Sequence, residues 1–165
     1  KAVPDEKIKK FLMAHYQIPD YQADVCVAFA QGNIGKAVQL ATSDSFNEIK
    51  NSALHLLKNV SKMEINDIIA TVKSVSEFKI DIQDYLDFLA VWYRDILYFK
   101  ATRDSNGLIF KDELNVITDQ INKSSYEGIE NILRGLQTAK TRLNANVNFD
   151  LTMELLFLLI KENLV

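Results

Sequence analysis

The sequence predicts an all-α protein: a bundle of about five to six helices preceded by three short helices. Three observations lead to this fold class. Apolar residues recur at helical spacing along the 165 residues, and no stretch shows sustained strand alternation. The 5 glycines and 2 prolines are too few for the many tight turns of a β-sandwich or β-barrel. A hydrophobic content of 48% argues against disorder.

Three short helices are predicted before residue 44. The first begins at Pro4, because proline is tolerated in a first helical turn and the acids that follow it oppose the helix dipole. The second begins at Pro19 and ends at Gly32, a glycine suited to a helix C-terminus. Asn33 can cap the third. The capping residues at 42–45 then predict a boundary between this segment and the rest of the chain.

A longer helical array follows this boundary. The spacing of apolar residues predicts helices over 45–60 and 63–78, and then a long helix from Asp81 to Thr102. The long helix is apolar on most of its circumference, so it must be covered on more than one side. We therefore expect it at the centre of the bundle or partly covered by another subunit.

Three further helices complete the array. A turn at 104–107 precedes a short helix. Ser124 and Ser125 can cap the next helix, and Glu127 is placed to complete a capping box with Ser124. Asn148 can cap the last helix, whose most apolar stretch, LLFLLI, is expected to be buried among other helices because it is too short for a membrane span.

Composition and charge exclude several functions. A formal net charge of -3 provides no global positive field for binding nucleic acid. The single cysteine, Cys26, permits no internal disulfide, and its apolar neighbours indicate a buried structural thiol. Residues 1–10 are charged and form no signal peptide, so we expect a soluble, cytoplasmic protein without membrane contact. Because the chain begins at Lys1 and not at a methionine, we expect it to be a fragment of a longer protein.

The segment QGNIGKA at 31–37 is similar to a phosphate-binding loop. Such a loop needs a glycine five residues before the Gly-Lys pair and a hydroxyl after the lysine. Here those positions hold Ala30 and Ala37, and the preceding segment is predicted to be helical rather than a strand. We expect no nucleotide cofactor at this segment.

Metal chemistry is also disfavoured. Neither His15 nor His55 has a carboxylate or a second histidine at ligand spacing on a shared helical face. Asp81, Asp84 and Asp87 lie roughly on one side of a predicted helix, where acids oppose the helix dipole and form a solvated stripe. The residues themselves thus predict a helical scaffold with no catalytic residue, metal or cofactor.

Three segments carry a resemblance to a known family. The segment 28–40, AFAQGNIGKAVQL, resembles the end of the small helical lid domain of bacterial AAA+ clamp-loader subunits. The segments YLDFLAVWYRDIL at 85–97 and LNANVNFDL at 143–151 resemble the C-terminal collar domain of the DNA polymerase III delta-prime family. Together the resemblance covers nearly the whole chain, with the segments in the right order.

The resemblance implies a domain organisation and a function. Residues 1–43 would be the remnant of the AAA+ lid domain, and residues 44–165 the collar domain. Collar domains hold the subunits of the clamp loader together, and the clamp loader uses ATP to place the sliding clamp on primed DNA during bacterial replication. The expected role is non-catalytic, with gamma/tau and delta subunits as partners and with DNA contacted only indirectly through the assembled complex.

The lid motif distinguishes between subunit types. In the ATP-binding gamma/tau relatives, an arginine that senses nucleotide occupies the position of Gly35. Lys36 lies one residue late for this role, and Gly32 and Gly35 fit the delta-prime pattern. The resemblance therefore implies a stator rather than an ATPase.

The adjacent aromatic residues Trp92 and Tyr93 predict a partner contact. They lie about 100° apart on a helix, so one packed face cannot easily cover both. Aromatic and arginine side chains contribute most of the binding energy of many interfaces. We expect Trp92 in the bundle core and Tyr93, Arg94 or Tyr98 nearer to the collar interface.

Two alternatives to the collar remain open at this stage. A helical adaptor or regulatory domain could bind a partner peptide in a groove. A helical enzyme could hold a divalent ion on Asp81, Asp84 and Asp87, but two-metal helical enzymes need acidic clusters on at least two helices, and the acids elsewhere lack suitable spacing.

Overall fold

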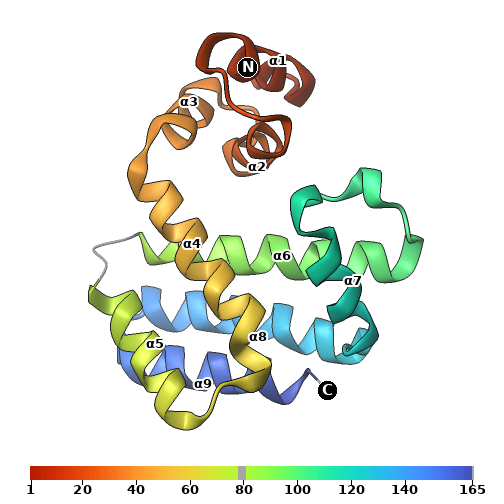
Figure 1. Cartoon of the computed structure of the whole chain (residues 1–165). Helices are drawn as coiled ribbons and strands as arrows, with labels where there is room; N and C mark the ends of the chain where they lie inside the picture. Colours follow the sequence, from red (N-terminus) through yellow and green to blue (C-terminus); the bar gives the residue numbers. More distant parts are fainter. Residues whose placement is uncertain (78–80, 165) are drawn as a thin grey trace.

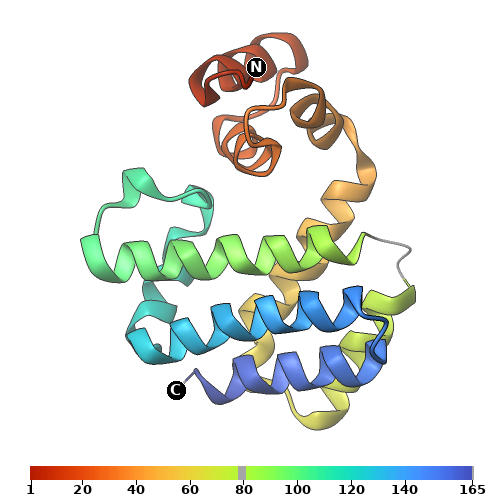
Figure 2. The same ribbon diagram turned by 180° about the vertical axis from the view of Figure 1, so that it is seen from behind.

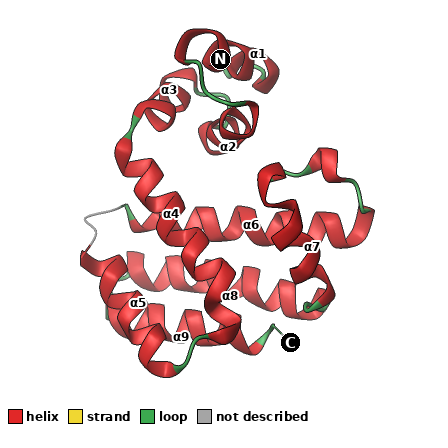
Figure 3. Ribbon diagram, in the orientation of Figure 1, coloured by secondary structure: helices red, strands yellow, loops and turns green. Residues whose placement is uncertain are grey.

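The computed structural model describes residues 1–77 and 81–164. Within these ranges it contains nine α-helices and no β-strand, which confirms the predicted all-α fold class (Figure 1, Figure 3). Ser124 and Leu164 form one isolated bridge. None of the helices in these ranges combines the length and the apolar content that a membrane span requires.

Three short helices form a small lobe at the N-terminal end of the chain (Figure 1). Asn33 caps the third helix as predicted, since its side chain accepts a hydrogen bond from the Lys36 N–H. The second helix ends at Gln31 and Gly32, which both have positive φ. The helices are α1 (Asp5–Tyr16), α2 (Asp20–Ala30) and α3 (Ile34–Thr42).

Six α-helices follow Ser43 and form the larger lobe. In Figure 2, α6, α8 and α9 lie side by side, and α4 and α5 cross behind them. Short 3-10 turns at 60–62, 105–107 and 111–113 connect the helices. The six are α4 (Asp44–Asn59), α5 (Ile65–Glu77), α6 (Ile82–Thr102), α7 (Leu114–Asn122), α8 (Tyr126–Asn144) and α9 (Phe149–Glu162).

The long helix α6 lies at the centre of this lobe, as its apolar circumference predicts. It packs against α4, α7 and α8. Two buried hydrogen bonds fix the relative positions of three of these helices. Trp92 Nε1 donates to Gln120 Oε1 at 3.0 Å, and Gln120 Nε2 donates to the Leu57 carbonyl oxygen at 2.8 Å. The buried amide thus connects α4, α6 and α7 while leaving neither of its own polar atoms without a partner.

Two local predictions need comment. The capping box of Ser124 with Glu127 is wrong, because Ser125 caps α8 by accepting a hydrogen bond from the Gly128 N–H. The Ser124 hydroxyl instead donates to the carbonyl oxygen of Gln120 and completes the end of α7. The helix predicted over 63–78 corresponds to α5, and Phe78 lies outside the described residues.

Candidate subunit interfaces

The segment 31–36, which contains two glycines, forms a turn between two helices. Gly32 has a φ of 80°, and its carbonyl oxygen accepts a hydrogen bond from the Val3 N–H at 2.9 Å. A Cβ at this position would lie 2.8 Å from a side-chain carbon of the N-terminal segment, so the turn requires glycine. Gly35 and Lys36 lie in the first turn of α3, where the Lys36 N–H donates to the Asn33 cap.

The three aspartates at the start of α6 have separate structural environments. Asp81 caps the helix by accepting a hydrogen bond from the Gln83 N–H at 2.9 Å, and Asp87 forms an ion pair with Lys140 of α8. Burial, together with the nearby Asp81, raises the pKa of Asp84. In the described part of the chain, no group of three or more His, Cys, Asp or Glu side chains could hold a metal ion.

The remaining reactive side chains also have structural positions. Cys26 is buried, as predicted, and burial raises the pKa of its thiol to about 11, so it stays protonated near neutral pH. His15 Nδ1 lies 3.0 Å from the carbonyl oxygen of Phe11, one turn earlier in α1. His55 is exposed on α4.

The three residues predicted nearer to the interface differ in accessibility. Tyr93 is fully buried together with Trp92, which corrects its expected position, because helices cover α6 on successive sides. Tyr98 is 37% exposed, and its hydroxyl donates to Asp104 Oδ2 at 3.1 Å, so it supports the following loop. Arg94 is exposed in a hollow between the two lobes and remains accessible to a partner.

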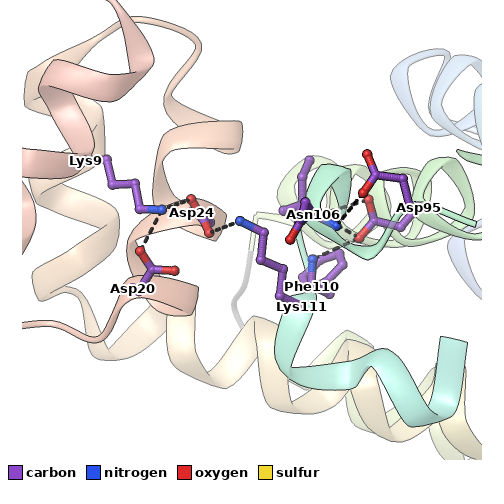
Figure 4. Close-up of polar contacts among 9 residues, drawn as sticks. Lys9, Asp20, Asp24, Asp95, Asn106, Phe110 and Lys111 are labelled. Carbon is purple, nitrogen blue, oxygen red and sulfur yellow. Dashed lines mark hydrogen bonds and ion pairs between the residues drawn. The ribbon is translucent and has the colours of Figure 1, made fainter. Parts of the chain in front are cut away.

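A chain of ion pairs joins the small lobe to the larger lobe (Figure 4). Lys9 Nζ of α1 lies 2.7 Å from Asp20 and 2.8 Å from Asp24, both on α2. Asp24 also pairs with Lys111 of the larger lobe at 3.2 Å. Hydrogen bonds to Asp20 and Asp24 raise the pKa of Lys9. Solvent screens ion pairs between exposed or partly exposed side chains, so this cluster defines orientation more than stability.

Asp95 of α6 holds the loop that carries Lys111 (Figure 4). Its buried carboxylate accepts hydrogen bonds from the Ile109 N–H, at 3.1 and 3.0 Å, and from the Phe110 N–H at 2.9 Å. Burial raises the pKa of Asp95, and the two backbone donors oppose that shift. The loop is therefore fixed where Lys111 can reach Asp24.

Aromatic packing completes the junction between the lobes. Phe29 of α2 stacks on Phe88 of α6, with ring centroids 5.7 Å apart, and contacts Phe46 of α4 edge-on at 5.4 Å. Phe110 then packs between Phe88 and Trp92, at 4.8 and 5.5 Å. The small lobe thus inserts an aromatic side chain into the core of the larger one.

A second candidate surface lies on the outer side of α9 and was missed by the sequence analysis. Leu156, Phe157 and Ile160 are buried, as predicted for the apolar stretch of this helix, but Leu155 is 47% exposed and Leu151 is 53% exposed. Their spacing of four residues is visible in the sequence. Sequence alone could not separate this second stripe from the buried one, because α9 is apolar on both.

The described residues form an all-α domain that has two lobes and exposed apolar side chains on its last helix. The family model for the C-terminal domain of the DNA polymerase III delta subunit matches residues 48–162, and the chain belongs to this family. The resemblance inferred from the sequence motifs is thereby confirmed.

The chain is similar to DNA polymerase III subunit delta′ of Bacillus subtilis (strain 168). The two sequences are 25% identical over 165 residues, which cover 98% of the chain and 48% of the relative. The chain therefore spans about half the length of this relative.

Proposed function

We propose that the chain is the collar region of a delta-prime-like clamp-loader subunit. Residues 44–165 would form the collar domain, and residues 1–43 would be the last part of an AAA+ lid domain. The observation that carries this proposal is the extent of the family match, which begins at residue 48 within α4 and ends at residue 162, the end of α9. The match thus coincides with the six-helix lobe and leaves out the small lobe.

In this role the chain acts through subunit contacts in the bacterial cytoplasm. It would associate with gamma/tau and delta subunits and support ATP-driven loading of the sliding clamp onto primed DNA, without contacting DNA directly. Gly35 occupies the position of the nucleotide-sensing arginine of the gamma/tau relatives. This difference supports a role as a stator rather than an ATPase. Lys36 borders a hollow that also contains Asp81 and Asp84, which is an acidic setting unsuited to a nucleotide phosphate.

The junction between the lobes is consistent with a stator. A subunit that does not hydrolyse ATP contributes a fixed geometry to the assembly. Here the ion pair of Asp24 with Lys111 and the insertion of Phe29 join the small lobe to the bundle. The orientation of the collar domain would therefore determine the orientation of the lid domain.

Sedimentation velocity tests this proposal. The chain would be centrifuged alone and mixed with the C-terminal domain of a gamma/tau subunit from the same organism. We expect a heteromeric species only in the mixture. Absence of any heteromer, both with this domain and with the full-length gamma/tau and delta subunits together, would contradict the collar assignment and favour an adaptor that binds another partner.

A further inference from the structure

The outer surface of α8 and α9 has the features of a helix-binding site. We define the α8–α9 face as Leu151, Leu155 and Leu159 of α9 with the groove between the two helices. Figure 2 shows these helices side by side, and no other helix among the described residues lies in front of them. The face lies within the residues matched by the family model.

Helix α9 has two apolar stripes. The inner stripe contains Met153, Leu156 and Ile160, which are buried in the core. The outer stripe contains Leu151 and Leu155, each about half exposed, and continues one turn later to the half-buried Leu159. Side chains at this spacing lie on one helix face, which is the arrangement that packs against a second helix.

The groove beside this stripe has a volume of about 360 Å³. Gly135 forms part of its α8 wall, where an added Cβ would lie 2.8 Å from Leu159 Cδ2, so the helices approach closely.

The two edges of the face carry opposite charges. Arg134 and Arg142 of α8 border the groove, with Glu162 at its α9 side. Asp150 and Glu154 lie on the other flank of α9, because helical spacing places them across the outer stripe from the groove. Among the described residues, neither these arginines nor these two acids form an ion pair within the chain.

We propose that the α8–α9 face binds an amphipathic helix of another clamp-loader subunit. This inference rests on the proposed collar function and specifies its contact surface. The partner helix has an apolar stripe that covers Leu151 and Leu155. It has carboxylates along the edge that faces Arg134 and Arg142, and basic side chains along the opposite edge. Such complementary charges select the partner and its direction along the groove.

The test compares two pairs of exposed apolar residues. Leu151→Glu with Leu155→Glu places two charges on the proposed face. Ile65→Glu with Ile69→Glu makes the same change at the same spacing on α5, at residues that are 64% and 46% exposed. Affinity for the C-terminal domain of a gamma/tau subunit, and for the delta subunit, would be measured by titration calorimetry. Circular dichroism melts would verify that both variants remain folded.

We expect the α9 variant to weaken one of these associations at least about tenfold, because charges replace apolar side chains at the centre of the contact. The α5 variant should change it less than about twofold, as expected for a surface outside the contact. Arg142→Glu should also weaken association, with a smaller effect at high salt.

Each contrary outcome has a distinct meaning. If association occurs and the α9 variant binds as tightly as the wild type, the face is wrong and the collar assignment stands. Equal weakening by both variants would also overturn this choice of face. If the chain alone forms a dimer that the α9 variant abolishes, a second copy is the occupant. If the wild type associates neither with the isolated domain nor with the full-length gamma/tau and delta subunits together, the proposed function itself fails.

Discussion

Replacement of Asp95 tests how the loop at the junction is held. The carboxylate accepts the N–H groups of Ile109 and Phe110, and Oδ2 alone lies 3.0 and 2.9 Å from the two nitrogens. Asp95→Ala leaves both donors without an acceptor. An unsatisfied buried donor costs roughly 1–3 kcal/mol, and the Phe110 donor is the more deeply buried, so we expect a loss of about 2–4 kcal/mol in the free energy of unfolding.

Asp95→Asn provides the matched control. An amide oxygen in the position of Oδ2 can accept both hydrogen bonds once the side chain turns its NH2 group away from the Ile109 N–H, which lies 3.1 Å from Oδ1 in the wild type. A neutral side chain also avoids the cost of burying a charge. We expect this variant to lie within about 1 kcal/mol of the wild type. Urea unfolding monitored by circular dichroism measures all three proteins. A loss for Asp95→Asn as large as that for Asp95→Ala would refute the reasoning.

The pH dependence of these proteins follows from the same carboxylate. Burial raises the pKa of Asp95 in the folded state above its unfolded value near 3.8, so the folded state binds more protons between these two pKa values. The contribution of Asp95 to stability therefore falls as pH rises through this window and is constant above it. Relative to the wild type, Asp95→Asn should gain stability from pH 3.5 to pH 7. No change in this difference with pH would contradict the raised pKa.

Three further predictions concern other parts of the structure. Phe29→Ala should lower the free energy of unfolding by about 3–5 kcal/mol and increase proteolysis around Ser43, as seen on gels, because the small lobe loses its buried ring. Gly32→Ala should lower the melting temperature, whereas Gly35→Ala should not, since only Gly32 has positive φ. Cys26 should react with Ellman's reagent at pH 8 only after unfolding, because its thiol is buried with a pKa of about 11.

Much of the fold follows from local signals in the sequence. Pro19, Asn33 and Asn148 each precede a helix, and the last two provide side-chain caps as predicted. Capping depends on a few neighbouring residues, so sequence is sufficient to locate it. The error at Ser124 also concerns neighbouring residues. Either of two serines could cap α8, and Ser125 does so because the Ser124 hydroxyl is hydrogen-bonded at the end of α7.

Predictions that depended on distant elements were less successful. The wide apolar circumference of α6 correctly indicated a central helix, but the position of Tyr93 depended on how many neighbours cover α6. For α9 the error was the reverse, since the apolar stretch was expected to be buried. This helix is as apolar as α6 but lies at the edge of the bundle, where Leu151 and Leu155 are exposed. Periodicity reports that a helix is apolar, and only the packing determines which apolar side chains are covered.

The junction between the lobes shows why short sequence motifs do not reveal contacts of this kind. Some catalytic and metal-binding sites impose fixed residue types at short spacings, and a sequence displays those sites directly. The contact of Asp24 with Lys111 joins residues 87 positions apart, and it depends on Asp95 holding the intervening loop. Each residue is ordinary by itself, and only the fold brings them together. The proposed collar role would likewise depend on the placement of such side chains, so its tests should perturb contacts rather than chemistry.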